Sequence, residues 1–152
     1  MRYHVYTIDG YGICDAYNAC EVTKERIEKL LTLAPGVSER FHEQFGTDYE
    51  IEDLDDYESD YGCIQGSFAL LCDVMNEAEH SDSLSDGVEF VSCEDFDCRK
   101  YVMYVPTYPW RMSDREKCMI SSGFIGELFT KYAKILFGMP PIVDYYTCEN
   151  GD

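Results

Sequence analysis

A run of thirteen residues in the first half of the chain, from Asp48 to Asp60, carries eight carboxylates and no lysine or arginine. The acids are Asp48, Glu50, Glu52, Asp53, Asp55, Asp56, Glu58 and Asp60. Runs of like charge are usually solvated faces, loops or tails. This run is internal, however, and its apolar and aromatic residues give it something to bury or to present: Tyr49, Ile51, Leu54, Tyr57 and Tyr61.

The run is the densest part of a longer acidic segment, residues 43–97. Between Arg40 and Arg99 the chain has eighteen Asp and Glu residues and no Lys or Arg. The formal net charge of the whole chain is −18, so this block alone accounts for it. Because nucleic-acid binders need a basic footprint, we expect no direct contact between this segment and nucleic acid.

The sequence leaves the conformation of the run open. Ile51, Leu54 and Tyr61 have the spacing of a helix face, whereas the alternation of Tyr49 and Ile51 with acids suits a strand. As a helix the run would carry one charge per about 2.4 Å of axis. That charge density approaches the one charge per about 1.7 Å of duplex DNA. The charge density of an extended strand is too low to approach it.

Tyrosines are interleaved with the acids at Tyr49, Tyr57 and Tyr61. A purely solubilising tract has few aromatic residues, so two interpretations compete. The run is either a passive solvated face or loop, or a surface that meets a basic partner. In the second case carboxylates would stand in for phosphates, and the tyrosines for stacked bases.

The order of predicted elements indicates one α+β domain over residues 1–152. Apolar patterns and turn signals predict strands at 3–8, 88–92, 99–105 and 141–148, with a turn at 9–12 and a frayed tail at 149–152. Strand, helices, strand, strand, helix, strand is the β-α-β-β-α-β order of ferredoxin-like folds. We therefore expect an antiparallel four-stranded sheet with helices on one face and an enlarged, acidic, helical first crossover.

The predicted helices follow from caps and apolar stripes. Thr23 has the position of an N-cap for a helix that ends at Pro35-Gly36, and Ser38 caps a shorter one to Phe45. The clearest stripe predicts a helix over 63–79 with Asp73, Glu77 and Glu79 on its outer face. Ser113 and Glu116 form a capping box for one short turn, and a strong amphipathic helix follows over 122–137.

The sequence contains no motif that identifies catalytic, metal-binding or cofactor-binding residues. No phosphate loop, nucleophile elbow or zinc-protease motif occurs, and three histidines are scattered along the chain. Of the eight cysteines, Cys93 and Cys98 could hold half a zinc site, but a second close pair is missing. We expect buried, reduced thiols, no metal and no cofactor. The segment at 82–93 lacks two carboxylates that a calcium loop needs.

The start of the chain lacks a signal-peptide pattern, and no stretch is apolar enough to cross a membrane. We therefore expect a cytoplasmic protein. In size and charge the chain resembles the DNA-mimic inhibitors that phages and mobile elements make against restriction or CRISPR systems. The resemblance implies a non-enzymatic protein whose residues 48–61 occupy the basic groove of a nucleic-acid-binding enzyme. The alternatives are a small enzyme or ligand-binding domain with a site on the sheet, and an acidic accessory protein without an inhibitory role.

Overall fold

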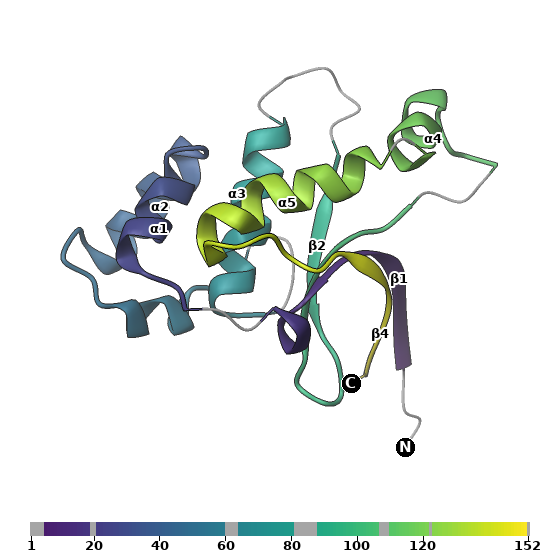
Figure 1. Cartoon of the computed structure of the whole chain (residues 1–152). Coiled ribbons are helices and arrows are strands. Elements are labelled where there is room, and N and C mark those ends of the chain that lie inside the picture. The colour runs from purple at the N-terminus through teal and green to yellow at the C-terminus, as the bar shows by residue number, and fades with distance from the viewer. Residues whose placement is uncertain are drawn as a thin grey trace.

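A computed structural model of the chain describes residues 5–18, 21–59, 64–80, 88–106, 110–121 and 123–151. It has the expected α+β architecture, with one sheet and a layer of helices (Figure 1). The elements are β1 (Val5–Cys14), η1 (Asp15–Tyr17), α1 (Lys24–Leu31), α2 (Pro35–Phe45), η2 (Ile51–Asp56), α3 (Ser67–His80), β2 (Phe90–Glu94), β3 (Lys100–Tyr104), α4 (Asp114–Ser121), α5 (Phe124–Phe137) and β4 (Asp144–Gly151).

The sheet has four antiparallel strands in the order β2-β3-β1-β4. This is the strand order of the split β-α-β arrangement, and it confirms the predicted topology. The face toward the helices carries Ile13, Phe90 and Val102, which are fully buried. Phe90 of β2 meets Phe129 of α5 edge to face, with ring centroids 5.2 Å apart. Helices α3 and α5 therefore cover this face, and the extra helices and the acidic run occupy the first crossover.

Strand β1 is longer than predicted, because the turn expected at residues 9–12 is wrong. Gly10 and Gly12 pair with the neighbouring strands as part of β1. A Cβ atom on Gly12 would lie 2.0 Å from the carbonyl oxygen of Val102, and one on Gly10 2.4 Å from that of Tyr104. These glycines thus allow a close approach of the β3 backbone rather than a turn. The predicted frayed tail is also wrong, since β4 pairs with β1 as far as Gly151.

The sheet curls until its two edges meet. Beyond β2, the backbone N–H of Phe96 donates to the carbonyl of Glu149 in β4 at 3.2 Å, and Asn150 Nδ2 donates to the carbonyl of Glu94. The enclosed face is filled by a second buried cluster, which consists of Cys14, Cys93, Tyr101, Met103 and Cys148. This closure explains how the face away from α3 and α5 buries its side chains.

Helix α3 lies at the centre of the molecule rather than at its surface. Nine of its residues are buried, among them Asp73 and Asn76, each 0% exposed. The expectation that Asp73, Glu77 and Glu79 form an outer acidic face is therefore wrong. Each of these acids accepts a hydrogen bond from another element: Asp73 from Tyr57, Glu77 from the backbone of Gly36, and Glu79 from Tyr132.

Several helix boundaries differ from the prediction. Ser38, predicted to cap α2, lies inside this helix, and α3 begins at Ser67 rather than near residue 63. Pro35 begins α2 instead of ending α1, which fits the preference of proline for the first helical turn, where its missing N–H is not needed. Ser113 caps α4 through the backbone N–H of Glu116 at 3.1 Å, as expected, but α4 extends for eight residues. Thr23 caps α1 and Gly138 ends α5 as predicted.

Candidate functional site

The acidic run forms a defined loop between α2 and α3. It is therefore neither the regular α-helix nor the strand that its apolar spacing allowed. It begins after Gly46 and contains the short 3-10 helix η2. A reciprocal capping box fixes the start of η2, because the Glu50 side chain accepts from the backbone of Asp53 while Asp53 Oδ2 accepts from the backbone N–H of Glu50 at 2.9 Å. An isolated bridge between Glu58 and Gln65 closes the loop.

Three buried side chains anchor this loop to the core. Tyr49, Leu54 and Tyr57 are 3%, 3% and 4% exposed. The Tyr49 hydroxyl donates to Glu28 Oε1 at 2.8 Å, and the Tyr57 hydroxyl donates to Asp73 Oδ2 at 2.5 Å. Anchoring at three points holds the intervening carboxylates in one arrangement, so the loop is not a flexible charged tract.

The burial of the tyrosines corrects one part of the expected site. Tyr49 and Tyr57 were expected to present their rings to a partner, and for both residues this is wrong, because ring and hydroxyl are engaged inside the fold. Burial, together with the hydrogen bond to Glu28, raises the pKa of Tyr49 above its ordinary value. Asp60 and Tyr61 lie outside the described residues.

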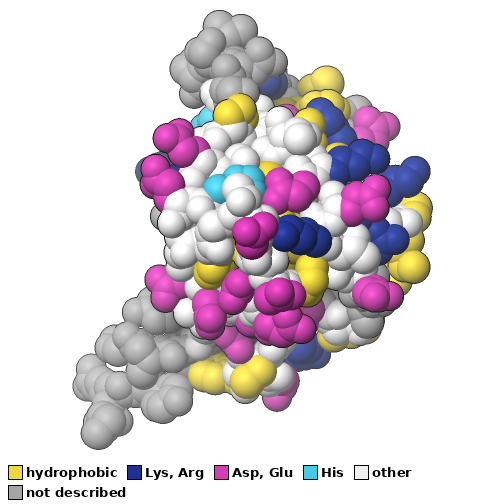
Figure 2. Space-filling model, turned by 90° about the vertical axis from the view of Figure 1, so that its left-hand side faces the viewer, with side chains coloured by type: hydrophobic (Ala, Val, Ile, Leu, Met, Phe, Trp, Pro, Cys, Tyr) yellow, Lys and Arg dark blue, Asp and Glu magenta, His cyan; other side chains and the backbone are white. Residues whose placement is uncertain are grey.

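The anchored loop carries a group of carboxylates at its surface, which we call the acidic ridge. It consists of Asp48, Glu50, Glu52, Asp53, Asp55, Asp56 and Glu58. All are exposed except Asp53, which is half-buried. Within the described part of the chain, none of these carboxylates forms a salt bridge with Lys or Arg. Figure 2 shows the side of the molecule with α1 and α2, where Asp and Glu lie mostly to the left and below, and Lys and Arg gather at the right.

Beside the ridge, three side chains from α1 and α2 form a hydrogen-bonded chain that the sequence pattern did not reveal. His42 Nε2 lies 2.9 Å from Glu28 Oε1, and His42 Nδ1 lies 3.3 Å from Ser38 Oγ. Partial burial acts to raise the pKa of Glu28, but its hydrogen bonds with His42 and Tyr49 outweigh this and lower it. Serine, histidine and carboxylate in this order are the parts of an activated nucleophile. The i, i+4 spacing of Ser38 and His42 on one helix was the available signal.

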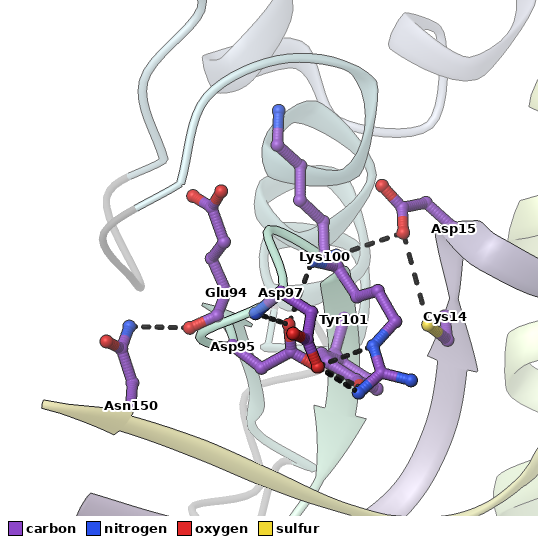
Figure 3. A network of polar contacts seen from close by, with 9 residues as sticks. Cys14, Asp15, Glu94, Asp95, Asp97, Lys100, Tyr101 and Asn150 are labelled. Carbon is purple, nitrogen blue, oxygen red and sulfur yellow. Dashed lines mark hydrogen bonds and ion pairs between the residues drawn. The ribbon is translucent and has the colours of Figure 1, made fainter. Parts of the chain in front are cut away.

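A second polar network lies at the tip of the β2–β3 hairpin (Figure 3). Asp95 accepts hydrogen bonds from the backbone N–H groups of Asp97 and Arg99, from Arg99 Nε and from the Tyr101 hydroxyl, at 2.8 to 2.9 Å. Burial acts to raise the pKa of Asp95, but these donors outweigh it and lower the pKa. Both carboxylate oxygens of Asp95 accept hydrogen bonds from the hairpin itself, so Asp95 stabilises the connection between β2 and β3.

The described cysteines do not form a reactive or metal-binding centre. Burial raises the pKa values of Cys14, Cys72, Cys93 and Cys148, which keeps these thiols protonated and poorly nucleophilic. Cys93 lies inside the curled sheet whereas Cys98 is exposed on the turn, so the two do not converge. No group of three His, Cys, Asp or Glu suited to a metal occurs among the residues that the structure describes. Most of the calcium-loop segment at 82–93 lies outside them.

Neither a protein-family model, nor a curated protein, nor a solved structure matches the chain. Among the helices of the described ranges, none combines the length and the apolar character needed to cross a membrane.

Proposed function

We propose that this chain is a non-enzymatic acidic binding protein that docks its acidic ridge against a basic surface of another protein, of the kind that normally holds a nucleic-acid backbone. The observation that supports this proposal is the anchoring of the ridge. Tyr49, Leu54 and Tyr57 fix the loop from within, and its carboxylates have no basic partner among the described residues.

The physical reason is preorganisation. Collecting like charges on one surface costs free energy through their mutual repulsion, and a basic partner recovers that free energy on binding. A loop that is already fixed loses less conformational entropy when it binds than a flexible acidic tail would. The buried tyrosines leave charge, rather than base-like stacking, as the means of recognition.

The test compares two variants that lose the same charge. In the ridge variant, Asp48→Asn, Glu52→Gln, Asp55→Asn and Asp56→Asn are combined; these side chains are exposed and make no hydrogen bond with other described residues. The control variant combines Glu25→Gln, Glu89→Gln, Asp114→Asn and Glu127→Gln, which are exposed and lie elsewhere. Both proteins and wild type are used to capture partners from the source cell at about 0.15 M salt.

We expect nucleic-acid-binding proteins to be retained by wild type and by the control variant, and to be lost by the ridge variant. For a purified partner, DNA should displace wild type in a binding competition, because both would occupy the same groove. Equal retention by all three proteins, or simultaneous binding of DNA and this chain, would contradict the proposal.

A second candidate function, hydrolysis of an ester or amide, is favoured by the Ser38, His42 and Glu28 contacts. It predicts that a fluorophosphonate probe labels wild type and that Ser38→Ala abolishes the label. The ridge proposal predicts no labelling in either protein. In that case the His42–Glu28 contact only joins α2 to α1, and the Ser38–His42 contact is internal to α2.

A further inference from the structure

On the side of the molecule where α1 packs against α5, a groove of about 550 Å³ is lined by four cations, Arg26, Lys29, Lys131 and Lys134. They are one third of the twelve Lys and Arg residues of a chain with net charge −18. Among the described residues, the only acid lining the groove is Glu25, so this lining carries four positive charges and one negative charge, a sum of +3. This local charge is opposite in sign to that of the whole protein.

The cations face one another across the groove because of helix geometry. Arg26 and Lys29 are three residues apart on α1, and Lys131 and Lys134 are three apart on α5, so each pair lies on one face of its helix. Within the described residues, none of the four forms a salt bridge with a carboxylate. Lys29 and Lys134 also lie in the last turns of their helices, where the dipole favours cations. That effect does not account for Lys131 or for the convergence of both pairs.

Arg26 is held in place rather than free to swing away. Its Nη1 atom donates to the carbonyls of Glu21 at 2.6 Å and of Phe137 at 3.3 Å. Gly138 makes room for it, since a Cβ atom there would lie 2.5 Å from the guanidinium carbon. The two carbonyls engage Nη1 alone, so donors on Nη2 and Nε remain for a ligand.

We propose that this groove binds the diphosphate group of a small phosphorylated ligand. The diphosphate group of an ester carries about −3 at neutral pH, with one charge on the inner phosphate and close to two on the outer one. This matches the charge of the lining, and arginine with lysines is the usual set of phosphate donors. A long polyanion fits less well. Those of its phosphates that extend outside the groove would lie against the surface of a protein whose net charge is −18.

The experiment titrates inorganic pyrophosphate into the full chain by isothermal calorimetry at about 0.15 M salt. The groove variant combines Lys29→Gln, Lys131→Gln and Lys134→Gln, and leaves Arg26 in its structural contacts. The control variant combines Arg111→Gln, Arg115→Gln and Lys117→Gln, three exposed residues near and on α4, and has the same net charge. Thermal melting of each variant establishes that it is folded.

Wild type and the control variant should bind one pyrophosphate with affinities within about twofold, and the groove variant should bind at least about tenfold more weakly. Orthophosphate should bind wild type at least about tenfold more weakly than pyrophosphate, and ADP about as tightly as pyrophosphate. Absence of saturable binding at about 10 mM, or equal weakening in both variants, would overturn the proposal. So would tighter binding of a single-stranded oligonucleotide, or self-association of wild type that the groove variant abolishes, because the groove would then take a different occupant.

Discussion

Asp73 of α3 and Asp55 of the acidic ridge carry the same carboxylate in opposite settings. Asp73 is fully buried, and its two oxygens accept hydrogen bonds from Tyr57 at 2.5 Å and Ser59 at 2.7 Å. Asp55 is exposed and contacts no partner among the described residues. The first kind of acid holds the loop in place, and the second kind is what the loop displays. The net charge alone therefore does not distinguish the acids that stabilise the fold from those that are exposed and unpaired among the described residues.

The largest expected difference between the two kinds of acid is in stability. Asp73→Ala leaves two hydroxyls without their acceptor and should lower the free energy of unfolding by about 3 kcal/mol. Asp55→Ala should change it by less than about 0.5 kcal/mol. Urea unfolding of both variants measures the contrast. A loss below about 1 kcal/mol for Asp73→Ala would mean that water or another donor replaces these bonds and that α3 does not anchor the ridge.

A second contrast appears in acid. The pKa of Asp95 is lowered in the folded protein, so its stabilising contribution is present above its ordinary pKa of about 3.8. That contribution is lost as the pH falls from there through the lowered folded value, because the unfolded state then binds the proton more readily. Asp95→Asn should show a smaller loss of stability between about pH 4 and pH 2 than wild type. Urea unfolding at several pH values tests this.

The ridge variant serves as the control for the acid experiment. Its four substitutions leave Asp95 and Glu28 unchanged, so it should keep the steep loss of stability below about pH 4. If Asp95→Asn and wild type lose stability in parallel while the ridge variant does not, the acid-sensitive carboxylates are on the ridge.

A third test concerns Glu77, which joins α3 to the first turn of α2. Glu77 Oε2 accepts from the backbone N–H of Gly36 at 3.0 Å, a position that suits a carboxylate because the N-terminal end of a helix is positive. Glu77→Ala should lower the free energy of unfolding by about 1 kcal/mol. Gly36→Ala should cost less than this. The new Cβ atom would lie 2.2 Å from Glu77 Oε1 and displace the end of that flexible side chain, but alanine favours the helix over glycine. The double variant should lose less than the sum, since both changes break one contact.

Most of the fold was predictable because its signals are local. The cap at Thr23, the stripe of α5 and the stop at Gly138 depend on residues within one or two helical turns. The strand order then followed from the sequence of elements. In β1 the prediction failed, because Gly10 and Gly12 signal a turn locally. In the fold these glycines allow the backbone of β3, which is far away in the sequence, to approach closely.

The site was predictable only in part for the same reason. The charge of residues 48–58 is a property of composition, and the structure places most of these acids at the surface. Whether a tyrosine is displayed or buried depends on distant partners, Glu28 for Tyr49 and Asp73 for Tyr57. The basic groove was invisible for another reason: Arg26 and Lys131 are brought together by the packing of two helices, and no run of the sequence contains both.

The smallest expected effect, and the most direct test of the ridge as an unpaired surface, is the response to salt. Like charges that lack basic partners repel one another, and the Debye length falls from about 10 Å at 0.1 M to about 3 Å at 1 M. Wild type should therefore gain stability with added salt near neutral pH. The ridge variant should be more stable at low salt by about 0.5 kcal/mol and should gain less from salt, because four of the repelling charges are gone. Thermal melting at both salt levels measures this, with sodium chloride chosen because sulfate also strengthens apolar burial. The four-fold control variant, with the same net charge, separates a local effect from a global one. Equal salt responses in the ridge and control variants would mean that the repulsion is spread over the whole surface and that the ridge is not its centre.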